Sequence, residues 1–464
     1  MKRVFFKIVF LKFFIIGFIF SQEVPIEYKI ADSVKFSYDL GKNWHSNSSL
    51  DQIRYTLGSE DSASNIAKVR MNSDLGFFYG NNFYYIFINN RISFKKNFFL
   101  DAKFRAANSG DQILGYTGIP RTKQRLGGFK SGEYDYASVG YQNEWLLFQL
   151  GRGRQSWGAG EDINIILTDF SPSYDHLLFG FDILDYKLRY FHGFLESIGH
   201  SSPINRYIVG RAIEKTNFKN LIFSFSEIII YQGENRPLDI SMISPVGLHS
   251  EIEFNNRQNY QGNKQNAVWQ FSLDYHWKKR FRISGNYLID ELTIDEEEIK
   301  QGESNLTGFS AKISYLIGNY RNFEILADLV VEKVGTYTFK HTYGMNNFVS
   351  RGLTLGNING SDFIKHTFNL RFYKDIKTNL IFSYSKLLSG ENNINLDPYS
   401  SYENIIKTNH PSGVNQNSYK MSSIFKYWIN DFFNLQTSYE IYSGHSSSKE
   451  LKFSLFYYHS FKKS

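Results

Sequence analysis

The chain has 464 residues, of which 42% are hydrophobic and 21% are charged, and its formal net charge is +7. This composition excludes a disordered chain and leaves enough length for a large core or a large closed sheet. Beyond the N-terminus no apolar run reaches about 20 residues, which excludes a polytopic helical membrane protein but not a barrel of alternating strands.

Residues 1–21 have the pattern of a secretory signal peptide. Two basic residues follow Met1, an apolar stretch runs from Phe13 to Phe20, and the small Ser21 could precede cleavage. An uncleaved N-terminal anchor is the alternative. Removal of the four basic side chains of this segment lowers the formal net charge from +7 to +3. An anionic partner is therefore only weakly indicated, and nucleic acid is not an expected ligand of an exported chain.

The rest of the chain divides into two parts. Residues 22–67 lack a clear pattern and are predicted to form a short periplasmic or plug segment. Residues 68–464 are predicted to form an all-β, antiparallel transmembrane barrel of roughly 16–18 strands. The segment "VWQFSLDYHW" (268–277) indicates such a strand, because from Trp269 onward apolar residues alternate strictly with polar ones. A strand with lipid on one side and water on the other has this period, and so does a strand of a soluble sandwich.

Similar alternating runs recur along the chain. They cover residues 83–94, 98–105, 145–152, 186–194, 221–226, 281–290, 309–317, 323–331, 368–372, 380–385, 433–442 and 451–461. Short connections such as Lys278-Lys279 or Asn97 contrast with long ones at 108–133 and 392–417, as expected for periplasmic turns and outer loops. The final run ends close to the C-terminus, which resembles the closing strand of a barrel.

The search for catalytic and metal-binding motifs is mostly negative. Ser156 in "GRQSWG" lies one position too far from Gly153 for a G-x-S-x-G elbow. No phosphate-binding loop or H-E-x-x-H motif occurs. The chain has no cysteine, so disulfides and thiolate metal sites are excluded. We expect no catalytic residues, no metal and no cofactor, although a cluster assembled across several strands would escape this search.

Three stretches are richer in polar and aromatic residues than a plain barrel requires: residues 151–180, 227–259 and 286–292. Aromatic rings beside amide, carboxylate and guanidinium groups suit sugar recognition, because rings stack on C–H surfaces while forked polar groups bind hydroxyls or acids. The predicted stacking platforms are Trp157 and Tyr231. The predicted anchors for acidic or hydroxylated groups are Arg152, Arg154 and Arg236. The predicted hydrogen-bonding partners are Asp162, Glu227, Asn256 and Asp290.

Each of these roles has a structural alternative. Trp157 could belong to the aromatic girdle at the membrane surface. Arg152 and Arg154 could pair with carboxylates inside the barrel. Glu227 has the same parity as Phe225, so it reaches the lumen only through a bulge, or else it lies beyond the lipid band.

The same stretches carry a family resemblance. The segments "GRGRQSWGAGEDINIILTDFSPSYDHL", "FSFSEIIIYQGENRPLDISMISPVGLHSEIEFNNRQN" and "YLIDEL" resemble the capsule-assembly outer-membrane protein (Wzi-type) family over about residues 145–295. The matching elements are a Gly-Arg strand leading to W-G-x-G and a later S-E-x-x-x-Y strand. Two features depart from the family: Gln232 separates Tyr231 from Gly233, and residues 22–67 show no helices long enough for a periplasmic bundle.

The resemblance implies a monomeric barrel of about eighteen strands in the outer membrane of a Gram-negative bacterium. It implies a lectin that binds surface or capsular polysaccharide and helps attach or organise the capsule, with outer-membrane lipid as its other partner. Two alternatives remain open: a diffusion porin with an open, charge-lined lumen, and a barrel enzyme, a lipase or protease, with a Ser/His/acid or Asp/His cluster at one rim.

Overall fold

The computed structural model describes residues 69–463 apart from short gaps. The gaps are 81–82, 95–96, 111–112, 122–127, 161, 219, 246, 249–250, 253–254, 256–264, 279, 293–295, 302–304, 321, 376, 396–409, 431–432 and 445–446. The predicted signal peptide (1–21) and the predicted periplasmic or plug segment (22–67) lie outside the described residues.

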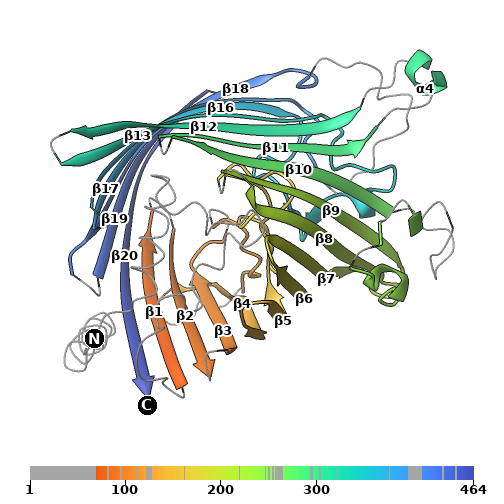
Figure 1. Cartoon of the computed structure of the whole chain (residues 1–464), viewed down its shortest axis with the longest axis horizontal. Coiled ribbons are helices and arrows are strands. Elements are labelled where there is room, and N and C mark those ends of the chain that lie inside the picture. The colour runs from red at the N-terminus through yellow and green to blue at the C-terminus, as the bar shows by residue number, and fades with distance from the viewer. Residues whose placement is uncertain are drawn as a thin grey trace.

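Eighteen antiparallel strands form one closed barrel, as the alternating runs predict (Figure 1). They are β1 (Val69–Tyr79), β2 (Tyr84–Phe94), β3 (Phe98–Ala107), β4 (Ser131–Gln142), β5 (Leu146–Gly153), β6 (Tyr174–Ile183), β7 (Tyr186–Ile198), β8 (Ile204–Phe218), β9 (Leu221–Glu234), β10 (Gln265–Trp277), β11 (Phe281–Glu291), β12 (Leu306–Tyr320), β13 (Phe323–Val334), β16 (Phe363–Asp375), β17 (Thr378–Ser389), β18 (Gln416–Trp428), β19 (Phe433–Gly444) and β20 (Ser448–Lys463). Each strand pairs with its sequence neighbours, and β1 pairs with β20 to close the ring.

The remaining elements are short and lie in the connections. They are the 3-10 helices η3 (Ile240–Ile243) and η4 (Gly344–Asn346), the α-helix α4 (Glu296–Gln301), and the hairpin of β14 (Val349–Ser350) and β15 (Leu353–Thr354). Among the residues that the structure describes, no helix has the length and apolar character needed to cross a membrane.

The two ends of the barrel differ in their connections. One end, here called the turn end, joins strands by short connections such as those at 143–145 and 184–185 and also holds the start of β1 and the end of β20. The other, the loop end, holds the long connections, among them 108–130, 154–173 and 335–362. This is the predicted asymmetry of periplasmic turns and outer loops.

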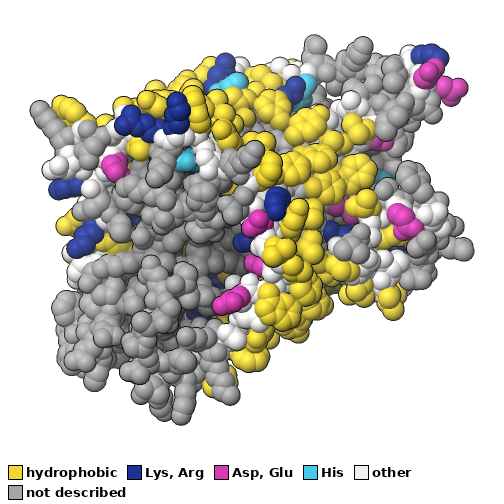
Figure 2. All heavy atoms as spheres, in the orientation of Figure 1, with side chains coloured by type: hydrophobic (Ala, Val, Ile, Leu, Met, Phe, Trp, Pro, Cys, Tyr) yellow, Lys and Arg dark blue, Asp and Glu magenta, His cyan; other side chains and the backbone are white. Residues whose placement is uncertain are grey.

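The outer wall is apolar and the lumen is polar. In β10 the outward residues Phe271 and Leu273 are each 39% exposed, whereas the inward Gln270 and Ser272 are buried. In Figure 2 hydrophobic side chains gather where Figure 1 draws β10 and β11. Exposed aromatic residues lie at the turn end, as in a membrane-interface girdle: Trp145, Tyr186, Phe218, Trp277 and Tyr320.

Five strands, β1, β4, β6, β8 and β18, have no counterpart among the predicted alternating runs, and the structure gives a physical reason for two of them. Residues 174–176 were expected in a loop, but they begin β6, whose inward residues Tyr174 and His176 are as buried as core residues. The strand β8 carries Arg206 and Arg211 on opposite faces, which breaks the apolar alternation.

Candidate functional site

The β5–β6 loop (residues 154–173) crosses the lumen. Its backbone is held on the far wall by Asn286 of β11, whose side chain accepts from the Ala159 N–H (2.7 Å) and donates to the Ala159 and Ile163 carbonyls (3.0 and 3.2 Å). The approach requires glycine: at Gly158 (φ +136°) a Cβ would lie 2.8 Å from Asn164 Oδ1 and 2.9 Å from Asn286 Oδ1. The "SWGAG" sequence therefore allows the loop to contact the opposite wall.

Asp162 extends this bridge to two further strands. Its carboxylate accepts from Lys312 Nζ of β12 (2.8 Å) and from Arg371 of β16 (3.3 Å). Arg371 also pairs with the buried Asp328 at 2.9 Å. The predicted hydrogen-bonding residue Asp162 thus links a loop to the lumenal charges of the far wall.

The β13–β16 loop (residues 335–362) also enters the barrel. Asp290, at a register shift near the end of β11, accepts the Phe339 N–H at 2.6 Å. Three strands away around the barrel, Arg206 of β8 donates to the Met345 and Asn347 carbonyls at 2.7 and 2.8 Å. Side chains of two wall strands, β8 and β11, therefore fix this loop by binding its backbone.

Together the two loops build an apolar core with the inner wall. The loops contribute Trp157, Ile165, Ile166, Leu167, Phe339, Phe348 and Leu355. The wall contributes residues from β5 to β11, β13 and β16, including Leu178, Phe191, Ile208, Ile228, Val268, Leu288 and Phe363. The Trp157 ring is 0% exposed and meets the Phe191 ring edge-on at 5.1 Å. Trp157 is thus a core residue inside the lumen, so the girdle alternative was wrong, and its ring has no free face for stacking.

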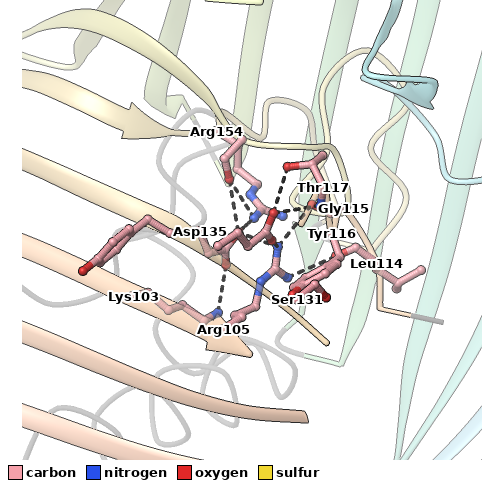
Figure 3. A network of polar contacts seen from close by, with 12 residues as sticks. Lys103, Arg105, Leu114, Gly115, Tyr116, Thr117, Ser131, Asp135 and Arg154 are labelled. Carbon is pink, nitrogen blue, oxygen red and sulfur yellow. Dashed lines mark hydrogen bonds and ion pairs between the residues drawn. The ribbon is translucent and has the colours of Figure 1, made fainter. Parts of the chain in front are cut away.

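The structure confirms the alternative role of Arg154, pairing with a carboxylate. The residue belongs to a buried ion network (Figure 3). Asp135, the extra residue at a β-bulge in β4, pairs with Arg154, with Arg105 (2.9 Å) and with Lys103 (3.2 Å). Arg105 also pairs with Glu133 and donates to backbone carbonyls of the β3–β4 loop. The network connects the start of the β5–β6 loop (residues 154–173), from here on called the crossing loop, to β3 and β4.

A second polar cluster lies on the outside of the barrel. Glu227 is paired without a register shift on both sides, with Arg211 of β8 and Trp269 of β10 opposite it. It therefore faces outward like Phe225, and the bulge alternative was wrong. Glu227 accepts from Arg211 (2.8 Å) and from Trp269 Nε1 (2.9 Å), yet its exposed fraction is only 1%.

The described residues of the β9–β10 loop from 236 to 252 (236–245, 247–248 and 251–252), here called the covering segment, bury this cluster. Arg211 donates to the Ser244 and Met242 carbonyls at 2.7 and 3.0 Å. Tyr231 receives the Asp239 N–H on its hydroxyl and contacts His192 Nε2 at 2.7 Å.

Arg236 completes the cluster. Its guanidinium stacks over the Tyr231 ring at 4.5 Å and pairs with Asp239 at 2.8 Å. The other face of the Tyr231 ring stacks on Tyr207 at a centroid distance of 4.9 Å. Neither predicted stacking ring, Trp157 or Tyr231, is open to a ligand in this structure.

The predicted residues thus separate into two groups. Arg154, Trp157, Asp162 and Asp290 lie in the lumen. Arg152, Glu227, Tyr231 and Arg236 lie on the outer wall, where Arg152 donates to the Tyr134 carbonyl at 3.0 Å and faces Asp175 at 3.7 Å. Asn256 lies outside the described residues. Sequence reasoning missed Arg105, Asp135, Arg206, Arg211 and Asn286, since polar residues at strand positions give no sign of the loops they hold.

A Ser/His/Asp trio does occur at the loop end, where the hydrolase alternative required one. The Ser412 hydroxyl, however, donates to Asp362 Oδ2 (2.5 Å), and His410 Nδ1 contacts Thr336 Oγ1 (3.2 Å). In a catalytic triad the serine donates to the histidine. Asp362 here acts as an anchor that also accepts the Asn392 and Ser412 N–H groups (2.9 and 2.8 Å). Among the described residues no cluster of His, Asp or Glu could hold a metal ion.

Asp362 is expected to make the loop end sensitive to acid. Burial would raise the pKa of Asp362, but hydrogen bonds from Ser412, Asn392 and Thr336 hold it below its usual range. Because the folded pKa is lowered, the stabilisation is present above the unfolded pKa of about 3.9 and is lost as the pH falls through the folded value. Asp362→Asn should cost about 1–3 kcal/mol at pH 7.

The measurement is the difference in free energy of unfolding between wild type and Asp362→Asn at a series of pH values. The difference should shrink as the pH falls below the unfolded pKa and through the lowered folded pKa of Asp362. The same comparison in a His410→Asn background removes the nearby histidine, whose own pKa is lowered by burial and by Lys333. A difference that does not change with pH would contradict the anchoring role of the carboxylate.

Comparison with known proteins places the chain by its fold. No protein-family model matches it, and no curated protein matches it at a significant level. It is similar to the Escherichia coli protein Wzi, described as an outer-membrane protein involved in group 1 capsule assembly and a carbohydrate-binding β-barrel, with 11% identity, 84% of each chain covered and a TM-score of 0.57. It is also similar to OprD of Pseudomonas aeruginosa (10% identity, 85% of this chain and 95% of that chain, TM-score 0.45). A third similar structure is OccAB4 of Acinetobacter baumannii (10%, 85% and 98%, 0.46). The fold is that of Gram-negative outer-membrane barrels.

Proposed function

We propose that this chain is a non-enzymatic, monomeric barrel of the outer membrane that binds surface polysaccharide and helps attach or organise the capsule. The observation that carries the proposal is the β5–β6 loop, which crosses the lumen and bonds to β11, β12 and β16. A loop that fills the lumen obstructs the diffusion of solutes through the barrel. It also supports the long loops at the loop end and keeps them rigid. Rigid loops suit recognition of a large ligand at the loop end.

Two further observations support a carbohydrate ligand. Wzi, which has a similar fold over 84% of both chains, is described as carbohydrate-binding. The segments of residues 145–295 that resemble the Wzi-type family include the crossing loop and the covering segment.

The exposed groups at the loop end are the proposed contacts. Tyr343 of the β13–β16 loop is 48% exposed and lies beside His341. Arg351, in the same loop, is exposed, and Arg152 lies near the loop end of β5 with 17% of its side chain exposed. We propose that the Tyr343 ring stacks on a sugar and that the two guanidinium groups bind its acidic or hydroxyl groups. The buried predicted residues would then act indirectly, by holding the loops in place.

The test combines conductance with retention of polysaccharide. Purified, refolded wild-type protein should give no steady conductance in a planar bilayer and should retain the cell's surface polysaccharide in a pull-down. Tyr343→Ala should weaken binding by about 1–3 kcal/mol, a magnitude taken from base–aromatic stacking.

The matched control is Trp277→Ala, an exposed aromatic residue at the opposite end of the barrel, which should leave retention unchanged. Steady open conductance of the wild type without retention would overturn the proposal and favour a diffusion porin. Equal loss of retention in both variants would place the ligand elsewhere than at the loop end.

A further inference from the structure

The Arg211–Glu227 pair lies at a height where the wall of a barrel faces lipid. Glu227 is six residues from the start of β9 at the turn end, which is about 20 Å along a strand. With a strand tilt of about 40° this corresponds to about 15 Å above the turn end, less than the apolar band of about 25 Å. The exposed girdle residues Tyr186, Phe218 and Trp277 mark the lower limit of that band.

The covering segment separates this pair from the surroundings. Met242 is 0% exposed and packs with Ile252 against the outward faces of Val209 and Ile229. An ion pair facing hydrocarbon directly would be costly. The inner side of the covering segment therefore acts as a second wall at the same height as the pair.

The other side of the covering segment is apolar and exposed. Leu238, Ile240, Ile243 and Leu248 are 49%, 74%, 44% and 49% exposed. The sequence "ISMISPVGL" of residues 240–248 contains no charged residue. An uncharged stretch that buries Met242 and exposes Ile240, Ile243 and Leu248 is unusual for a loop in water.

We propose that the covering segment is a lipid-contacting element whose outer side lies among the acyl chains of the outer leaflet. Its apolar side chains continue the exposed surface that Ile213, Phe223 and Phe271 form on the same wall. The height of the segment, the absence of charged residues from 240 to 248 and this continuity all fit hydrocarbon as its neighbour. The inference rests on the membrane location of the barrel and is independent of polysaccharide binding.

Spin labelling tests the proposal directly, because the chain contains no cysteine. Single-cysteine variants Ile240→Cys and Ile243→Cys of the full chain each receive one nitroxide and are reconstituted in phosphatidylcholine vesicles. Collision rates with oxygen, which partitions into lipid, and with a water-soluble nickel chelate are then measured. The lipid control is Phe271→Cys, and the water control is Ile119→Cys, an apolar residue of the β3–β4 loop that is 80% exposed.

Labels at residues 240 and 243 should match Phe271→Cys, with high oxygen and low nickel collision. A match to Ile119→Cys would overturn the proposal. Spectral broadening that disappears on dilution with unlabelled protein would also overturn it, because the occupant would then be a second copy of the chain. If one variant does not refold, Leu238→Cys on the same exposed side replaces it.

Discussion

Trp157→Ala is expected to lower the free energy of unfolding by about 3–5 kcal/mol and to make a silent barrel conduct. The ring is completely buried between the crossing loop and the inner wall, so its removal leaves a cavity at the centre of the lumenal core. The same residue holds the loop through its backbone, which pairs with Leu167 and accepts from Gln270. Chemical unfolding in lipid vesicles, followed by circular dichroism, and planar-bilayer conductance measure the two effects.

Two control variants sharpen this experiment. Trp277→Ala removes a half-exposed girdle ring and should change stability much less, with no conductance. Trp157→Phe keeps most of the ring and also removes an indole N–H for which no acceptor is found among the described residues, so it should cost less than alanine. If Trp157→Ala behaved like Trp277→Ala, the crossing loop would not be part of a packed core.

Removing either partner of the Arg211–Glu227 pair should cost about 3–5 kcal/mol, because each leaves an uncompensated buried charge. Arg211→Ala would also leave the Ser244 carbonyl without this donor and the Met242 carbonyl with only the Tyr190 hydroxyl. Glu227→Ala would leave the Trp269 N–H without its acceptor. Unfolding in lipid vesicles gives the free energies of both variants.

The double variant Arg211→Met with Glu227→Leu should be much less destabilised than either single variant, since apolar groups replace the pair together. The exposed pair of Lys300 and Glu296 in α4 serves as the comparison, and Lys300→Ala should change stability by less than about 1 kcal/mol. If Arg211→Ala and Glu227→Ala each lowered the free energy of unfolding by less than about 1 kcal/mol, the covering segment would not seal the pair from its surroundings.

The barrel could be predicted from the sequence because a strand between lipid and water must alternate, as Phe271 and Ser272 do. The alternation is lost where a strand faces a packed loop instead of water or lipid, and there the sequence does not predict the strand. Tyr174 and His176 face a packed loop, and Tyr207 and Arg211 face the covering segment, so their strands lack the simple period.

The candidate residues were selected by chemical type, and their surroundings could not be predicted in the same way. Trp157, Tyr231 and Arg236 have the chemistry of a sugar site, yet all three are buried under or within loops. The parity of Glu227 left a bulge or a position beyond the lipid band open, and only the structure shows that Glu227 faces outward beneath a covering segment. The position of a long loop depends on contacts such as those of Asn286 and Arg206, which are distant in sequence and have no local signature.

The span of the crossing loop has a consequence for the order of folding. Its bonds join residues far apart in the chain: Ala159 with Asn286, Ile163 with Ser310, and Asp162 with Arg371, at separations of 127, 147 and 209 residues. Hairpins between neighbouring strands close short loops, whereas these contacts close very long ones and gain nothing until the far wall exists. The loop should therefore dock late, after β10 to β16 have assembled, and a nascent barrel would pass through a stage in which its lumen is still empty.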